Sequence, residues 1–242
     1  MHSVGILVAL PAEGRTLHRG RLHQGRINPL PEGHLLALSG TGPERAKILA
    51  EALIRQGVRG LVSWGCAAAL APDIRQGQLI LAEKVLDEQG VPYPVHRDWR
   101  QTLSQTLGTL EPSGGTLLAS ARVIADPEEK MRLHEATGAL ALDMESGALA
   151  RLASEAQLPF LVIRSVSDEA RMALPRPVLG AMSDDGEVRL LALFGGLARE
   201  PRSLPGLIRL GQGFQSAMKT LKISRALLAA DLGLSSALKG LP

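Results

Sequence analysis

The sequence contains one cysteine, Cys66, and few aromatic side chains, which make up 2% of its 242 residues. A single cysteine excludes an intramolecular disulfide, and the sequence has no cluster of Cys and His at the spacing of zinc ligands. We therefore expect no metal. Because such sparing use of cysteine is typical of a reducing compartment, we also expect a cytoplasmic location.

Long hydrophobic runs are absent as well. The longest nearly apolar stretch, Gly60 to Pro72, is too short to cross a bilayer. The N-terminal residues MHSVGILVAL carry no basic group ahead of their apolar run, so they predict a first strand and not a signal peptide. With 45% hydrophobic and 21% charged residues, and no linker or repeat, we expect one domain over residues 1–242.

Positive charge gathers in the C-terminal segment, about residues 197–242, where seven Lys or Arg stand against two acidic residues, a net of +5. The segment from Pro205 predicts an amphipathic helix with one apolar face, formed by Leu207, Leu210, Phe214, Met218 and Leu221. We expect this face to dock on the sheet or on a partner subunit. Peripheral contact with anionic lipid at the inner membrane face is the alternative. Nucleic-acid binding is not expected, because the basic residues are not interleaved with rings.

The stretch from Ala139 to Ala170 organises the chain. It predicts a strand ending at Asp143-Met144-Glu145, a helix from Ser146 to Gln157, and a strand from Phe160 to Val166 that leads to Ser167 and Asp168. Apolar residues three and four apart mark the helix, and Pro159 closes it. Two acidic clusters therefore follow two strands, at the sheet edge where α/β proteins bind ligands.

Arg164 interrupts the second of these strands. Because a buried guanidinium is costly without an anion, we expect Asp168, Glu145 or a bound anion to pair with it.

The remaining chain alternates strand and helix patterns, which indicates an α/β fold. The expected strands are Val4 to Leu10, Leu35 to Ser39, Leu61 to Trp64, Gln78 to Ala82 and Thr116 to Ala121. Helices are expected from Pro43 to Gly57 and from Pro127 to Glu135, a loop from Asp87 to Trp99, and a turn at Asp184-Asp185-Gly186. The loop carries Tyr93, His96 and Trp99, for which ordinary packing is favoured over a lid.

The motif D-M-E-S at 143–146, followed by R-S-V-S-D at 164–168, resembles the core of the nucleoside phosphorylase and nucleosidase superfamily. The opening GILVALPAE, residues 5–13, is similar to the first strand of that family. The resemblance implies a three-layer αβα fold with a central mixed, twisted sheet, a homodimer, and cleavage of a purine N-glycosidic bond. It implies no cofactor, with phosphate as the alternative co-substrate to water.

The resemblance also implies roles for individual residues. Asp168 would protonate purine N7, for which it must be protonated near neutral pH, and burial could achieve this. Glu145 and Met144 would hold the ribose, Glu13 would take a proton from water, and Arg164 would orient that water or bind an oxyanion. From the residues alone, Glu13 is equally well a first-turn residue of the next helix.

Three further residues complete the predicted substrate site. Ser167 precedes the acid, and Val123 and Ile124 belong to a segment that faces the purine in the family, with Val123 where an aromatic ring usually stands. Cys66 lies in G-C-A-A-A-L, where the family usually has G-S-A-G-G-L. Because a thiol is a weak donor, this change argues against tightly held phosphate. A structural core cysteine is the alternative interpretation.

The segment from Ala173 to Leu210 is similar to the hopanoid-associated members of the superfamily, which act on adenosylhopane. That resemblance implies a nucleoside with a bulky apolar 5′ group as the substrate. Methylthioadenosine or S-adenosylhomocysteine is the second candidate and futalosine the third. A nucleoside-binding module without activity stays open, on account of the altered G-C-A-A-A stretch.

Overall fold

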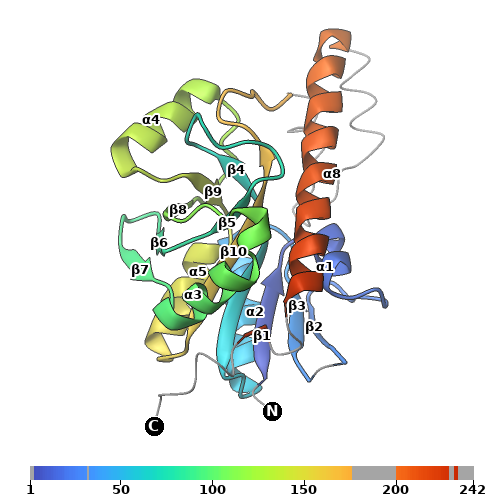
Figure 1. Cartoon of the computed structure of the whole chain (residues 1–242), viewed down its shortest axis with the longest axis vertical. Coiled ribbons are helices and arrows are strands. Elements are labelled where there is room, and N and C mark those ends of the chain that lie inside the picture. The colour runs from blue at the N-terminus through green and yellow to red at the C-terminus, as the bar shows by residue number, and fades with distance from the viewer. Residues whose placement is uncertain (1–2, 32, 176–199, 229–231, 234–242) are drawn as a thin grey trace.

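The structure is a computed structural model that describes residues 3–31, 33–175, 200–228 and 232–233 (Figure 1). Its strands are β1 (Val4–Val8), β2 (Arg26–Pro29), β3 (Leu35–Leu38), β4 (Gly60–Ala69), β5 (Leu79–Leu81), β6 (Lys84–Leu86), β7 (Pro92–Pro94), β8 (Thr116–Ala119), β9 (Ala141–Asp143) and β10 (Phe160–Asp168). Its helices are α1 (Pro11–Leu17), α2 (Pro43–Arg55), α3 (Arg97–Thr106), α4 (Pro127–Thr137), α5 (Ser146–Glu155) and α8 (Leu204–Leu227), with single 3₁₀ turns at Gly108–Leu110 and Pro201–Ser203.

The described strands form one ten-stranded mixed sheet in the order β2-β3-β1-β4-β9-β8-β6-β7, with β10 paired to β4 and β5. Strands β3, β1, β4 and β10 run parallel, so their carboxyl ends meet at one edge. The long strand β4 lies at the centre and pairs with β1, β10 and β9 along its length. The predicted fold class, a mixed twisted sheet flanked by helices, is confirmed.

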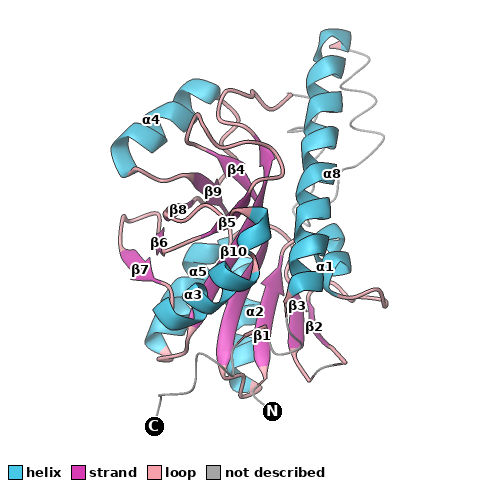
Figure 2. Ribbon diagram, in the orientation of Figure 1, coloured by secondary structure: helices cyan, strands magenta, loops and turns pink. Residues whose placement is uncertain are grey.

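Helices cover both faces of the sheet, as Figure 2 shows. On one face α2 and α5 pack on each other, α2 against β1 and α5 against β4. On the other face α8 lies along β10 and also contacts α1 and β5. The core between these layers is aliphatic, and Trp64 is its largest fully buried side chain together with Trp99.

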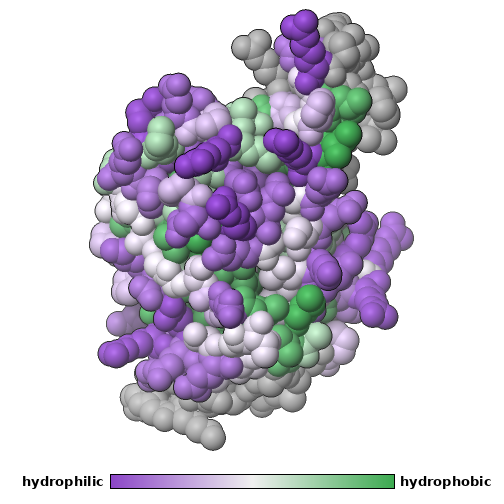
Figure 3. All heavy atoms as spheres, turned by 45° about the horizontal axis from the view of Figure 1, so that its top comes forward, coloured by the Kyte–Doolittle hydropathy of each residue, from purple (hydrophilic) through white to green (hydrophobic). Residues whose placement is uncertain are grey.

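The predicted apolar face of α8 docks on the core. Met218 and Leu221 are buried, and Phe214 packs against the same core. The other side of the helix carries large apolar side chains that stay exposed, namely Leu204, Ile208, Ile223 and Leu227. Figure 3 shows a face on which hydrophobic areas are small beside the hydrophilic ones. Within the described residues, no helix has the length and apolar character needed to cross a membrane.

A glycine permits the close approach of α8 to β10. A Cβ atom on Gly213 would lie 2.1 Å from the carbonyl oxygen of Ser167 and 2.2 Å from Nε2 of Gln76. Both distances are far below van der Waals contact. The position of α8 is therefore coupled to the end of β10, where Ser167 and Asp168 lie.

Three expectations about elements need correction. Residues 65–69 continue β4, because β10 and β9 supply pairing partners beyond Trp64. The segment from Asp87 to Trp99 is not all loop, since it contains β7 and the first turn of α3. Trp99 is buried, and its Nε1 donates to the carbonyl of Leu232 at 2.8 Å. Strands β2 and β6 were not predicted. The predicted turn at residues 184–186 lies outside the described residues.

Candidate active site

A pocket of about 150 Å³ opens at the carboxyl ends of the parallel strands. It draws its walls from the ends of β1, β4, β9 and β10 and from the segment after β8. Nearly all the predicted site residues line it: Glu13, Cys66, Val123, Ile124, Met144, Glu145, Ser167 and Asp168. The exception is Arg164, which lies buried beneath the pocket. The fold thus gathers carboxylates from three distant parts of the chain around one space.

Asp143 fixes the entry into α5. One of its carboxylate oxygens accepts hydrogen bonds from the backbone N–H groups of Glu145 (3.2 Å) and Ser146 (3.0 Å), and the other accepts from the hydroxyl of Ser146. A carboxylate that binds free N–H groups at a helix N-terminus stabilises that terminus. The D-M-E-S motif is therefore a helix start that aims Glu145 into the pocket.

Glu145 is held from the opposite side by α2. The backbone N–H of Gly42 donates to its Oε1 at 2.9 Å, across a chain separation of 103 residues. Gly42 has φ 99°, a conformation that glycine adopts without strain, and this turn directs its N–H toward the pocket. Burial, followed by the neighbouring charge of Asp143, raises the pKa of Glu145 to about 7.

Glu13 is both a first-turn residue of α1 and a member of the pocket. Its Oε2 accepts from the N–H groups of Ala9 (3.0 Å) and Leu10 (2.9 Å), and its Oε1 from the N–H of Cys66 (2.8 Å). Burial raises the pKa of Glu13, and the charge of Arg164 opposes that shift. A buried carboxylate with a raised pKa is a stronger base, which suits proton abstraction near neutral pH.

Arg164 contacts several polar side chains beneath the pocket. Its Nη2 lies 2.6 Å from Oδ2 of Asp143 and 3.8 Å from Oε2 of Glu145, and donates to the hydroxyl of Ser63 at 2.6 Å. Burial lowers the pKa of Arg164, but these carboxylates outweigh burial and raise it above its ordinary value. The nearest anion is thus Asp143, which was not predicted; of the predicted partners Glu145 lies further away, and Asp168 pairs with Lys130 instead.

Cys66 lines the pocket beside Glu13 and is partly buried. Burial, and then the charge of Glu13, raises the pKa of its thiol well above the ordinary value. The thiol is therefore neutral at physiological pH and is a weak hydrogen-bond donor.

Asp168 has a fully buried cation as its partner. Nζ of Lys130 lies 2.6 Å from Oδ2 of Asp168, and the hydroxyl of Ser167 donates to Oδ1 at 2.8 Å. The expectation for Asp168 considered only its burial, and the structure adds an ammonium group in direct contact with the carboxylate. Sequence analysis missed Lys130, since hydropathy favours Met131 as the inward residue of α4, yet Met131 is 54% exposed and Lys130 is 0% exposed.

Aliphatic side chains form much of the remaining wall. Val123 and Ile124 stand on one side, with Leu142, Leu174 and Leu10 among the others. The described residues that line the pocket include no aromatic ring. A flat base in this pocket would be held by aliphatic contact and polar groups, without ring stacking.

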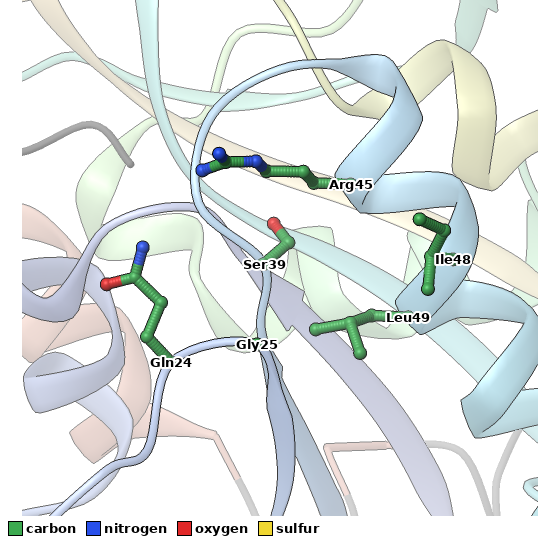
Figure 4. Close-up of a pocket in the computed structure, with 6 residues that line it drawn as sticks. All are labelled: Gln24, Gly25, Ser39, Arg45, Ile48 and Leu49. Carbon is green, nitrogen blue, oxygen red and sulfur yellow. The ribbon is translucent and has the colours of Figure 1, made fainter. Parts of the chain in front are cut away.

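A larger hollow, of about 480 Å³, lies outside the sheet edge next to α2. Figure 4 shows Arg45 and Gln24 extending over it, with Ser39, Ile48 and Leu49 around it. The described residues that line it include no Asp or Glu. Tyr93 and His96 line a third cavity, of about 250 Å³, near the start of β10. Neither hollow contains the residues that the motifs predicted.

Comparisons with known proteins agree with this fold. The chain is 26% identical over 220 residues to a 5′-methylthioadenosine/S-adenosylhomocysteine nucleosidase from Mycobacterium bovis, covering 69% of this chain and 86% of the relative. Among solved structures it is similar to that nucleosidase from Neisseria meningitidis, in complex with methylthio-immucillin-A, with a TM-score of 0.68, 17% identity, and coverage of 97% of this chain and 100% of the other. It is also similar to futalosine hydrolase from Helicobacter pylori, with a TM-score of 0.65, 16% identity, and coverage of 93% and 97%.

The family comparison spans most of the chain. Residues 6–179 match the model of the phosphorylase superfamily, and this range includes every residue of the pocket. The superfamily match, the mixed sheet and the pocket at its carboxyl edge lead to one conclusion: the chain belongs to the phosphorylase superfamily.

Proposed function

We propose that this protein hydrolyses the N-glycosidic bond of a 5′-substituted adenosine and releases adenine. The observation that carries the proposal is that Glu13, Glu145 and Asp168 line one pocket. Cleavage of this bond builds positive charge on the sugar and negative charge on the base. A catalyst needs an acid for the base, a carboxylate near the sugar and a group that activates the nucleophile.

Asp168 is the proposed acid, which delivers a proton to N7 of the purine. It lies at the end of β10 beside Val123 and Ile124, which would contact the flat face of the base. Ser167 orients the carboxyl through its hydroxyl. Protonation at N7 neutralises the departing base, so it lowers the barrier to bond cleavage.

Glu145 and Met144 are proposed to bind the ribose. The backbone N–H of Gly42 and the guanidinium of Arg164 hold Glu145, so its remaining acceptor capacity can bind sugar hydroxyls. A fixed carboxylate here also stabilises the positive charge that develops on the ring.

Glu13 is proposed as the base that activates water. A carboxylate at the nucleophile site repels phosphate, and the neutral Cys66 thiol is a poor donor to it. Nη2 of Arg164 is engaged with Asp143 and Ser63, and the charge of the guanidinium opposes the rise that burial causes in the pKa of Glu13. These features favour water over phosphate, and the reaction requires no cofactor.

For the substrate we propose adenosylhopane, with ribosylhopane and adenine as products. The sequence similarity from Ala173 to Leu210 suggests this substrate. Methylthioadenosine or S-adenosylhomocysteine is the second candidate, because the curated relative is named for those substrates. Futalosine is the third, from the structural neighbour named for it.

Assembly and surface contact belong to this proposal too. We propose a homodimer, because the superfamily that the sequence motifs resemble implies one.

A second proposal concerns the membrane surface. Leu204 and Ile208 on the exposed side of α8, next to Arg202 and Arg209, suit contact with anionic lipid. Sedimentation of the full chain with anionic and with neutral vesicles tests that contact, and equal recovery in both supernatants contradicts it.

The decisive experiment measures free adenine. Purified protein is incubated with adenosylhopane, methylthioadenosine, S-adenosylhomocysteine and futalosine, the last assayed for free hypoxanthine, each with and without phosphate. Release without phosphate is expected, fastest for adenosylhopane. Asp168→Asn and Glu13→Gln should each lower kcat by a factor of about 10² to 10⁴. Asp73→Asn, at an exposed position outside the pocket, is the matched control and should retain full activity.

The other outcomes discriminate among the alternatives. A requirement for phosphate would identify a phosphorylase. A preference for methylthioadenosine would replace the proposed substrate with the second candidate. No release from any nucleoside, with binding retained, would identify a nucleoside-binding module.

A further inference from the structure

Lys130 is a buried cation that the reaction proposed above does not use. It belongs to α4, and its side chain is 0% exposed. Lysine is almost never fully buried unless it is paired, because removing an ammonium from water costs several kcal/mol. The partner of Lys130 therefore accounts for its position.

All three protons of the Lys130 ammonium have acceptors. Nζ donates to Oδ2 of Asp168 at 2.6 Å, to the carbonyl of Glu169 at 3.2 Å and to the carbonyl of Met172 at 3.2 Å. Asp168 lines the pocket, whereas Lys130 lies behind it. Lys130 is therefore placed to influence a bound nucleoside through Asp168, without touching it directly.

Other titratable groups lie near the ion pair of Lys130 and Asp168, and each has its own position or partner. On α4 itself, Glu128 pairs with Arg132, and Glu129 pairs with Arg122. The carboxylate of Glu169, from the strand end, lies 4.0 Å from Arg75. From β4 and α1, Cys66 and Glu13 face the same pocket as Asp168.

The ion pair raises a chemical difficulty for the proposed acid. A carboxylate that is paired with an ammonium carries no proton that it can give to N7. The pair as a unit, however, holds one transferable proton. Ammonium with carboxylate and amine with carboxylic acid differ only in where that proton lies, and burial disfavours the two separate charges.

We propose that Lys130 is a positioning residue that stores the proton which Asp168 delivers to the departing purine. This inference rests on the proposed function. As the bond between C1′ and N9 breaks, its electron pair passes to the purine, and negative charge there draws a proton from the carboxyl to N7. Lys130 supplies the proton of that carboxyl and becomes a neutral amine.

The attacking water completes the reaction. The water oxygen forms a bond to C1′ and gives one proton to Glu13. Adenine leaves with its new proton, and the sugar leaves with a hydroxyl. Exchange with solvent then moves one proton from Glu13 to Lys130, which restores the enzyme.

Lys130→Arg tests the inference most directly. Arginine keeps the positive charge and the donors but does not give up a proton at any working pH. We expect kcat for adenine release at neutral pH to fall by a factor of about 10² to 10⁴. Activity should recover as the pH is lowered, because Asp168 then takes the proton for N7 from solvent. Lys84→Arg, at an exposed position of β6, is the matched control and should leave kcat unchanged.

Lys130→Met gives a different signature. Without the cation, buried Asp168 binds its own proton, so activity should persist at acidic pH. As the pH is raised, the variant should lose activity at a lower pH than the wild type does. A riboside with a p-nitrophenolate leaving group, which needs no proton, should be cleaved by Lys130→Arg at close to the wild-type rate. Loss of that activity too would show a purely structural role and overturn the inference.

The outcomes separate the inference from the proposed function. A wild-type protein that releases no adenine refutes the proposed function. An active wild type with an unchanged pH profile and kcat in Lys130→Arg refutes only the role of Lys130.

If the arginine variant does not fold, the wild-type protein supplies a second measurement. With ¹⁵N-labelled lysine, the Nζ signal of buried Lys130 should change from ammonium to amine when a C-nucleoside with a basic ring nitrogen binds. A signal that stays at the ammonium position overturns the inference.

Discussion

Nη2 of Arg164 and Oδ2 of Asp143 lie 2.6 Å apart beneath the pocket, with 1% and 2% of their side chains exposed. This ion pair joins the middle of β10 to the start of α5. Through it, the middle of β10 and the segment after β9, two strands that both pair with β4, hold Glu145 in place.

Breaking this buried pair should strongly destabilise the fold. Asp143→Asn leaves the guanidinium of Arg164 buried without its main counter-charge, and such a change costs about 3 to 5 kcal/mol. Denaturant unfolding measures the loss. The exposed pair of Glu51 and Arg55, 3.9 Å apart on α2, supplies the control, because Glu51→Gln should change stability by less than about 0.5 kcal/mol. Equal effects of the two variants would contradict a structural role for the buried pair.

Glu145 should make stability depend on pH. Its pKa is raised from 4.5 to about 7, so between these values the folded state binds more protons than the unfolded state. Stability of the wild type should therefore fall as the pH rises from 4.5 to 7, and stay lowered above that range. In Glu145→Gln the fall should be smaller. Melting temperatures across this range test the point, and identical pH dependence in both proteins would refute it.

The contact of α8 with β10 can be tested by two glycines of the same helix. Gly213→Ala places a Cβ atom against the carbonyl of Ser167, so the helix must shift and Asp168 with it. We expect a loss of stability of about 1 to 3 kcal/mol and reduced adenine release. Gly211→Ala meets no atom within 4 Å and should stabilise the helix by about 0.5 to 1 kcal/mol. If both variants behave alike, the close packing at Gly213 is not important.

Cys66 should react slowly with alkylating reagents. Burial and the charge of Glu13 raise the pKa of the thiol, so little thiolate is present at pH 8. Mass spectrometry should show slower modification by iodoacetamide than for free cysteine. Glu13→Gln removes the largest of the neighbouring charges that raise the pKa of the thiol, and should speed the reaction. Rapid modification of the wild-type protein would contradict this description of the site.

Local sequence determined much of the fold. Apolar residues spaced three and four apart mark α5, and the structure starts it at Ser146 as predicted. It ends two residues early, where Gln157 takes φ 52° ahead of Pro159. Strand β10 and helices α2, α4 and α8 also lie where periodicity, Pro and Gly place them, because these signals act over a few residues.

Contacts between distant side chains followed from the folded arrangement and not from local patterns. No spacing indicates that Asp143 faces Arg164, that Gly42 donates to Glu145, or that Lys130 turns inward while Met131 faces solvent. Residues 65–69 likewise became strand only because β10 and β9 offer them hydrogen-bonding partners. Contacts between distant segments depend on packing and pairing, and these forces leave no period in the chain. Local patterns thus located helices α2, α4, α5 and α8, most strands and the acidic candidates, whereas the folded structure determined which group each acid contacts.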